Sequence, residues 1–113
     1  MEKIRRIVYF KAYFKDFYDA QTRKVKEKID LGLYYLQYTQ QIPGRFVGSA
    51  DEKNLFYLRI KQGSDIFRIF FCYDEGNLVI LMNGFSKKTQ KTPKSEINKA
   101  IKIKKEYFDG KAT

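Results

Sequence analysis

The second half of the chain alternates hydrophobic and polar side chains in a way that predicts a sheet. Apolar residues recur at every second position, and turn-forming residues separate the segments. The expected strands are Leu55–Lys61, Ile66–Tyr73 and Leu78–Phe85. Asp74–Asn77 are expected to form a tight hairpin turn between the last two, because Asp, Gly and Asn favour that geometry. This part of the chain is therefore expected to be an antiparallel sheet.

The first half of the chain has a different hydrophobic period. A short strand is expected at residues 4–10, where alternate apolar residues can share one face. Two helices are then expected over residues 11–20 and 24–40, with a break near residues 19–22. Residues 41–54 contain one proline and two glycines and are expected to be a loop. The buried stripes of the two helices are expected to contain Phe14, Phe17, Tyr18, Val25, Ile29, Leu33 and Leu36.

A third helix is expected near the end of the chain. Thr92 can act as its N-cap, and Pro93 suits the first helical position. The helix is expected to continue through residues 94–108. The element order is then β-α-α-β-β-β-α, which predicts an α+β fold whose helices cover one face of an antiparallel sheet. The buried face of this helix is expected to contain Ile97, Ala100, Ile101 and Phe108.

Length and composition limit the possible functions. The 113 residues are expected to form a single domain over 1–113, with residues 109–113 as a candidate flexible tail. There is no histidine and only one cysteine, Cys72, so His-based catalysis and His- or Cys-rich metal sites are excluded. No metal or cofactor is expected. The chain has neither a transmembrane-length apolar run nor a signal-peptide core, so a cytoplasmic location and no membrane partner are expected.

The net charge of +10 is unevenly distributed along the chain. Residues 1–50 carry ten Lys/Arg and five Asp/Glu, and residues 86–113 carry nine and three. Residues 51–85 carry four and five and are nearly neutral. Such a basic domain is expected to attract a polyanion: nucleic acid, an anionic membrane or an acidic protein.

The strand register predicts a cationic face on the sheet. If Phe56, Leu58 and Ile60 pack against the helices, then side chains on the opposite face include those of Arg59 and Arg68. Like charges on adjacent strands destabilise a sheet unless an anion binds between them. Single-stranded RNA would supply that anion, and Tyr57 or Phe70 could stack on a base. The remaining candidates for this face and its rim are Lys61, Lys87, Lys88 and Lys91.

These residues also carry a resemblance to a known family. The segments "LFYLRI", "FRIFFCYDEGNLVILMNGFSKKTQKTP" and "EINKAIKIKKEY" resemble the HigB-type, phage-associated branch of the RelE/ParE toxin superfamily. The resemblance is detailed over residues 55–107, and the family arginines fall on Arg59 and Arg68. The family lysine pair falls on Lys87 and Lys88.

The resemblance implies a RelE-like fold and the toxin of a type II toxin–antitoxin system. Such a toxin is a ribosome-dependent endoribonuclease, or mRNA interferase, that cleaves mRNA in the ribosomal A site and inhibits translation. Its partner is a cognate antitoxin with a helix-turn-helix domain, similar to HigA, and operator DNA is bound only through that antitoxin.

The chemistry of RNA cleavage can be compared with the available side chains. The reaction needs a proton removed from the 2′-OH, charge stabilised on the phosphate and a proton given to the 5′-oxygen. Arg59 and Arg68 suit charge stabilisation, as do Lys87 and Lys88, and either lysine could transfer a proton if its pKa is lowered. Tyr57 is a further candidate for proton transfer, although a phenol of ordinary pKa is a poor base.

Two other functions fit the same sequence. A ParE-like protein would poison gyrase without cleaving RNA, and a non-catalytic RNA-binding module would have no toxicity. An RNA-cleaving enzyme needs Arg59, Arg68 and the lysine pair on one face, whereas a plain RNA binder would lose affinity by small, roughly additive steps when they are replaced.

Overall fold

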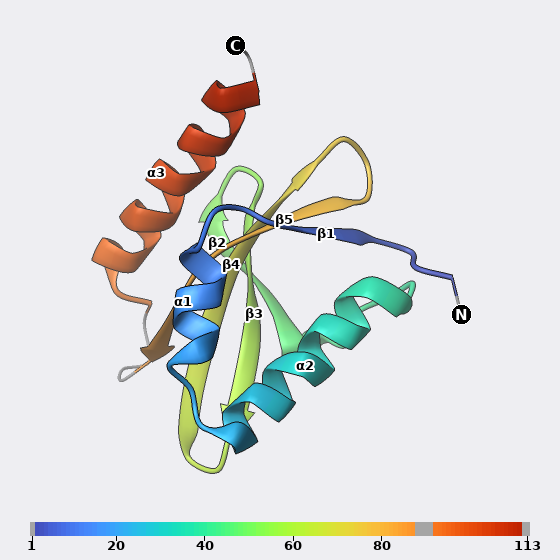
Figure 1. Ribbon diagram of the computed structural model, residues 1–113, viewed down its shortest axis with the longest axis vertical. Coiled ribbons are helices and arrows are strands. Elements are labelled where there is room, and N and C mark those ends of the chain that lie inside the picture. The colour runs from blue at the N-terminus through green and yellow to red at the C-terminus, as the bar shows by residue number, and fades with distance from the viewer. Residues whose placement is uncertain (1, 88–91, 112–113) are drawn as a thin grey trace.

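In the computed structural model, which describes residues 2–87 and 92–111, one mixed sheet lies between helices (Figure 1). The chain order is β1 (Arg6–Tyr9), α1 (Tyr13–Asp19), α2 (Arg23–Tyr38), the 3-10 helix η1 (Gly44–Phe46), β2 (Val47–Glu52), β3 (Leu55–Gln62), β4 (Asp65–Asp74), β5 (Leu78–Lys87) and α3 (Lys94–Lys111). The α+β class predicted from the sequence is confirmed.

The two helices predicted in the first half of the chain are also confirmed. The break between α1 and α2 lies where it was expected, and α2 begins after Thr22. The Thr22 hydroxyl accepts a hydrogen bond from the backbone N–H of Val25, which satisfies one of the unpaired donors at the start of the helix. The strands β3, β4 and β5 match the three predicted strands to within two residues at each end.

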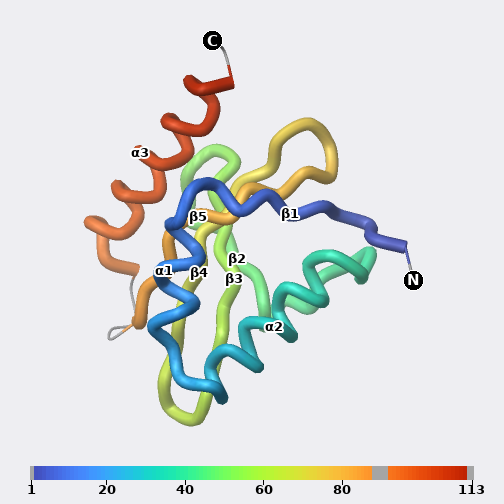
Figure 2. Tube along the Cα trace, in the orientation of Figure 1, coloured from blue at the N-terminus to red at the C-terminus, as the bar shows by residue number. Residues whose placement is uncertain are grey.

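The sheet differs from the predicted one in two respects. Residues 47–52, expected to be part of a loop, form the edge strand β2, which pairs antiparallel with β3. At the other edge, β1 pairs parallel with β5, so the strand order is β1-β5-β4-β3-β2. Figure 2 shows β1 running beside β5 although the two are far apart in sequence. The sheet is therefore mixed, and the prediction of a purely antiparallel sheet was wrong.

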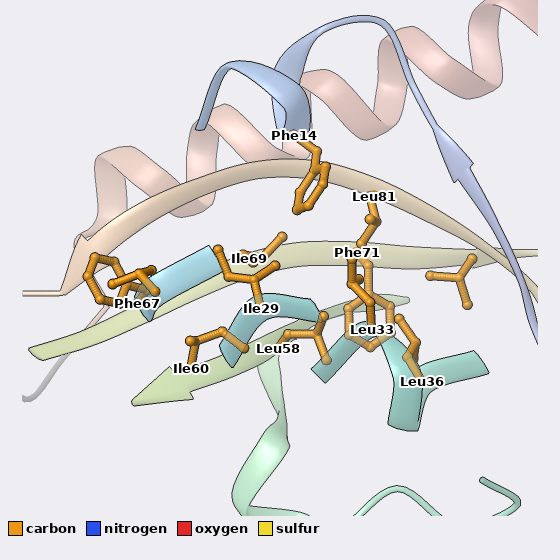
Figure 3. Packing of buried hydrophobic residues seen from close by; sticks show 12 residues of the cluster. Phe14, Ile29, Leu33, Leu36, Leu58, Ile60, Phe67, Ile69, Phe71 and Leu81 are labelled. Atoms are coloured by element: carbon orange, nitrogen blue, oxygen red, sulfur yellow. The ribbon is translucent and has the colours of Figure 1, made fainter. Parts of the chain in front are cut away.

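One face of the sheet packs against α1 and α2. In Figure 3, Ile29 and Leu33 of α2 point toward Leu58 and Ile60 of β3. Phe14 of α1 belongs to the same cluster. As predicted, every second residue of β3 and β4 faces these helices, because the side chains of a strand alternate between its two faces. The strand members of this core are Leu58, Ile60, Phe67, Ile69, Phe71, Val79 and Leu81.

The opposite face is covered in part by α3, so the prediction that helices cover only one face was wrong. Phe70, Cys72, Ile80 and Met82 form a second core with Ala100 and Ile103 of α3. The physical reason is that β4 and β5 are apolar on both faces, as strands buried on both sides are. Ile97, Ile101 and Phe108 pack at the margin of this core, and Ile103, which is missing from the predicted stripe, is buried in it.

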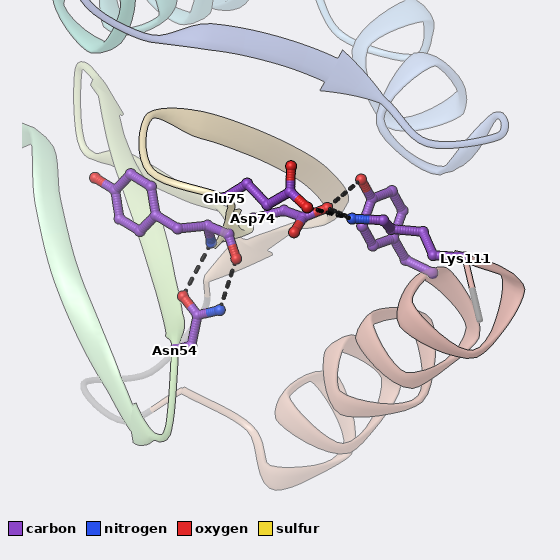
Figure 4. Close-up of polar contacts among 6 residues, drawn as sticks. Asn54, Asp74, Glu75 and Lys111 are labelled. Atoms are coloured by element: carbon purple, nitrogen blue, oxygen red, sulfur yellow. Dashed lines mark hydrogen bonds and ion pairs between the residues drawn. The ribbon is translucent and has the colours of Figure 1, made fainter.

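The end of α3 is held to the β4–β5 turn by a group of polar contacts (Figure 4). The Asp74 carboxylate accepts hydrogen bonds from the Tyr107 hydroxyl at 2.8 Å and from Lys111 Nζ at 2.6 Å. On the neighbouring hairpin, the Asn54 side chain both donates to and accepts from the backbone of Tyr73. The Asp74 contacts therefore fix the end of α3 to the β4–β5 turn, and the Asn54 contacts fix the β2–β3 turn to β4.

The two ends of α3 differ from the predicted ones. The helix begins at Lys94, so Pro93 precedes it, and the Pro93 carbonyl accepts hydrogen bonds from the backbone N–H groups of Glu96 and Ile97. The Thr92 hydroxyl, predicted to cap the helix, accepts a hydrogen bond from Arg68. The helix continues to Lys111, so residues 109–111 of the predicted tail are helical, and residues 112–113 lie outside the described residues.

Within 2–87 and 92–111, none of the helices combines the length and the apolar character that crossing a bilayer requires.

Candidate nucleic-acid interface

Arg59 of β3 and Arg68 of β4 are directly opposed in the antiparallel ladder. Cβ atoms at opposed positions of this kind are roughly 4.5–5.5 Å apart, so the two cations share one small region of the sheet. Both lie on the face that carries α3, at the margin of the second core, whose member Phe85 is the β5 partner of Arg68. The structure therefore places these two predicted site residues together, Arg59 exposed and Arg68 buried.

Arg68 is the more constrained of the two arginines, with only 9% of its surface exposed. Its guanidinium carbon lies 4.1 Å from the centroid of the Tyr57 ring, and Nη1 donates a hydrogen bond to the Thr92 hydroxyl. Its Nε is buried without a partner in the described part of the chain. Burial lowers the pKa of Arg68, the nearby Tyr57 raises it and Arg59 lowers it. A buried guanidinium with an unused donor is uncommon, and it marks Arg68 as a candidate functional residue.

Gly48 on β2 determines where the Tyr57 ring lies. The two residues are opposed across β2 and β3. A Cβ atom built at Gly48 would lie 2.4 Å from the Tyr57 hydroxyl oxygen, so only glycine leaves room for the ring in this position. Tyr57 therefore lies across the edge strand, and the Arg68 guanidinium packs on the face of its ring in a cation–π contact.

Lys87 ends β5 on the same face, two residues beyond Phe85, the partner of Arg68. Its own cross-strand partner is Ile66. Burial lowers the pKa of Lys87, and the charges of Arg68 and then Arg59 lower it further. A lowered pKa makes the ammonium group a better proton donor near neutral pH than an ordinary lysine.

The cationic centre is defined as Arg59, Arg68 and Lys87. None of the three takes part in an ion pair with another residue in the described ranges. Three neighbouring cations without a carboxylate partner repel one another, and this repulsion is relieved when a phosphate binds.

The remaining predicted site residues lie as follows. Lys61 is exposed on β3, on the same face as Arg59. Phe70 is completely buried and stacks on Phe85 with ring centroids 5.7 Å apart, so its predicted role as a base-stacking surface was wrong. The cause is again α3, which covers that part of the face. Lys88 and Lys91 lie outside the described residues.

Two polar residues beside the centre were not predicted as site residues. Asn83 is 2% exposed, donates at 3.4 Å to Glu96 Oε1 of α3, and leaves its own Oδ1 without a partner in the described residues. The signal for Asn83 is present in the sequence, because it is a single polar residue within the apolar run of β5. Thr92 was assigned as a helix cap only, and its contact with Arg68 depends on tertiary structure.

The described residues indicate neither a metal site nor a nucleophilic cysteine. They contain no group of three or more His, Cys, Asp or Glu residues arranged to hold a metal ion. Cys72 is buried as predicted, and burial raises the pKa of its thiol to about 11. The thiol is therefore protonated at neutral pH and is a poor nucleophile.

Comparison with known proteins places the chain in a family. A model described as phage-derived protein Gp49-like (DUF891) matches residues 12–105, which is most of the chain. The chain belongs to the Gp49-like family. The match spans α1 to α3 and includes every residue of the cationic centre of this Gp49-like protein. The Gp49-like family is known in toxin–antitoxin contexts. No curated protein matches the chain.

Proposed function

We propose that this Gp49-like protein is the toxin of a type II toxin–antitoxin system and acts as a ribosome-dependent endoribonuclease on translated mRNA. The observation that carries the proposal is the cationic centre: two directly opposed arginines and a lysine of lowered pKa, none of them paired with a carboxylate in the described residues. The family membership and the resemblance to HigB-type toxins support the same conclusion.

The proposed reaction is an internal transesterification at one phosphate of the RNA. The 2′-oxygen loses its proton to a water molecule and forms a bond to phosphorus, and the bond from phosphorus to the 5′-oxygen breaks. The products are a 2′,3′-cyclic phosphate and a 5′-hydroxyl. Arg59 and Arg68 stabilise the charge that develops on the non-bridging oxygens. Lys87, which has a lowered pKa, donates the proton that the 5′-oxygen needs.

Tyr57 has a different role in this scheme from the one expected. Because its ring supports the Arg68 guanidinium, we assign it as a positioning residue. Orientation of this kind contributes to catalysis by holding the charge-stabilising group where the transition state needs it. The ribosome is expected to complete the arrangement by presenting the mRNA backbone, and the cognate helix-turn-helix antitoxin is expected to block toxicity.

The test is induced expression in bacteria followed by primer extension on translated mRNAs. We expect growth arrest and new 5′ ends within coding sequences. Arg68→Ala should abolish both, whereas Arg23→Ala should not. Arg23 is a matched control because its side chain is 93% exposed on α2 and its one ion pair within residues 2–87 and 92–111 is with Glu27.

Other outcomes would favour the alternatives. Growth arrest without new 5′ ends would overturn the proposal, and accumulation of cleaved gyrase–DNA complexes would then favour a ParE-like gyrase poison. RNA binding without any growth arrest would favour a non-catalytic module.

A further inference from the structure

A groove lies at the open edge of β3, next to the cationic centre. Strand β2 begins at Val47, opposite Leu58, so residues 59–62 of β3 extend past its end. The 3-10 helix η1 and α2 border this open edge and leave a groove of about 460 Å³. Its size is within the range of pockets that hold small ligands.

The lining of the groove is cationic at its rim and apolar at its base. Four exposed cations contribute, and no carboxylate lines it. The ion pairs of the described residues include none of these four cations. The rim therefore attracts an anion and has none of its own to offset the charge. The cations are Lys28, Arg45, Arg59 and Lys61.

The apolar lining offers flat surface rather than a deep hole. The Phe46 ring of η1 packs against the Arg45 guanidinium, 4.9 Å from its centroid, and against the Tyr35 ring, 5.0 Å from centroid to centroid. Leu31 of α2, which is 40% exposed, and Ile66 of β4 complete this surface. Aromatic and guanidinium planes of this kind are surfaces on which bases stack without sequence preference.

Arg59 links the groove to the cationic centre, because it lines the groove and is also opposed to Arg68. A single ligand with a repeating negative charge can therefore contact both places. Single-stranded RNA has this property, since its phosphates repeat along the backbone and its bases alternate with them. An acidic peptide also carries repeated negative charge, but it has no bases to place against the apolar lining of the groove.

We propose that the groove binds the RNA strand next to the cleaved phosphate, with a flanking phosphate between Arg45 and Lys28 and a base against the apolar surface of Leu31 and Ile66. This inference rests on the proposed function and extends it, because it assigns a second subsite whose residues, apart from the shared Arg59, take no part in the reaction. The subsite gives affinity and sets which part of the strand reaches Arg68.

The test measures binding without cleavage. Fluorescence anisotropy of the purified protein would use labelled RNA oligonucleotides of three and nine nucleotides, fully 2′-O-methylated so that no 2′-OH can react. The test variant is Lys28→Glu/Arg45→Glu. The matched control is Arg23→Glu/Lys24→Glu, which makes the same charge change on exposed positions of α2 outside the groove.

We expect the groove variant to bind the nine-nucleotide RNA at least tenfold more weakly than the control, and the trinucleotide equally well. The slope of its log binding constant against log salt concentration should also become shallower by roughly 0.7 for each lost phosphate contact. Equal affinity of the two variants for the longer RNA, or no binding of that RNA by the unmodified protein, would overturn the inference. Capture of an acidic protein partner by the groove without an effect on RNA would do so as well.

Failure of the proposed function gives a different pattern. If induced cells show no new mRNA ends but groove-dependent binding of the longer RNA persists, the reaction is wrong and the subsite stands. If new ends appear and the groove variant binds RNA as the control does, the reaction stands and the subsite is wrong.

Discussion

The Arg68 guanidinium lies on the ring of Tyr57, 4.1 Å from its centroid, and is shielded from solvent there by the surrounding chain. A buried cation without a carboxylate partner is costly, since desolvation disfavours the charged form and the opposed Arg59 repels it. A protein retains such a residue when its charge has a use. The relationship between Arg68 and Tyr57 therefore predicts a conflict between stability and activity.

Replacing Arg68 by Met should test that conflict. We expect Arg68→Met to raise the free energy of unfolding by roughly 1 kcal/mol, because an apolar side chain of similar length avoids the desolvation penalty. The same substitution should abolish toxicity. Urea denaturation and growth assays measure the two effects. Arg59→Met, at an exposed position, should abolish toxicity while changing stability by no more than about 0.5 kcal/mol. A marked loss of stability in Arg68→Met would show that the arginine is structural.

Gly48 should be required for the position of Tyr57. A Cβ at residue 48 would lie 2.4 Å from the Tyr57 hydroxyl, so Gly48→Ala must displace the ring and with it the support of Arg68. We expect the free energy of unfolding to fall by about 1–3 kcal/mol and cleavage to fall at least tenfold. Gly44→Ala is the control, because a Cβ there meets no atom within 4 Å. In Gly48→Ala/Tyr57→Ala, the loss of stability should be smaller than the sum of the two single losses, because the clash is absent, and cleavage should not recover. Additive losses in the double variant would contradict this account.

The role of Lys87 predicts a specific pH dependence. The protonated form of an acid catalyst is the active one, so cleavage should decline as the pH rises through the pKa of Lys87, which burial lowers below that of an ordinary lysine. Lys87→Arg keeps the charge but does not titrate in this range. We expect this variant to be slower by roughly 10²-fold and to lose the alkaline decline, as measured by cleavage rates on programmed ribosomes. An unchanged pH profile would exclude Lys87 as the proton donor.

The sequence predicted well which residues of β3 and β4 share a face, because successive side chains of a strand must point to opposite faces of the sheet. Once Leu58 and Ile60 face the helices, Arg59 must face the other way, and the short turn at Gly63 fixes which residue of β4 opposes it. The pairing of Arg59 with Arg68 follows from these local rules. It could therefore be predicted without knowledge of the rest of the fold.

The second core could not be predicted from the same rules alone. Phe70 alternates correctly with its neighbours, but whether its face is open or covered depends on where α3 packs. The continuous apolar runs of β4 and β5 indicate strands that are buried on both faces. In β4, however, the polar Arg68 between apolar residues also fits a strand with one exposed face. Strand β2 was missed because an exposed edge strand with a glycine and several polar residues has a weak pattern.

The packing of α1 on the sheet should depend on Gly84. A Cβ at this position would lie 2.6 Å from Cδ2 of Phe17, so α1 approaches β5 only because residue 84 has no side chain. We expect Gly84→Ala to reduce the free energy of unfolding by about 1–3 kcal/mol in urea denaturation. At Gly110, in the last turn of α3, a Cβ would meet no atom within 4 Å. Gly110→Ala should therefore leave stability unchanged or raise it by up to about 1 kcal/mol. Equal effects of the two substitutions would show that Phe17 can move without cost.

The attachment of α3 should weaken in acid through Asp74. Hydrogen bonds from Lys111 and then Tyr107 hold the pKa of the Asp74 carboxyl below its usual value. A group whose pKa is lower in the folded state stabilises the fold above its unfolded pKa of roughly 3.9, and this contribution is lost as the pH falls through the folded value. Asp74→Asn should therefore lower the melting temperature clearly at pH 7 and much less at a pH well below the unfolded pKa, because the contribution of the wild-type carboxylate is lost as it protonates. Glu75→Gln is the matched control, because Glu75 is 85% exposed and lies 3.8 Å from Lys111, so its effect should be small at both pH values. If the difference in melting temperature between Asp74→Asn and wild type does not change with pH, then packing and not the charge of Asp74 holds the end of α3.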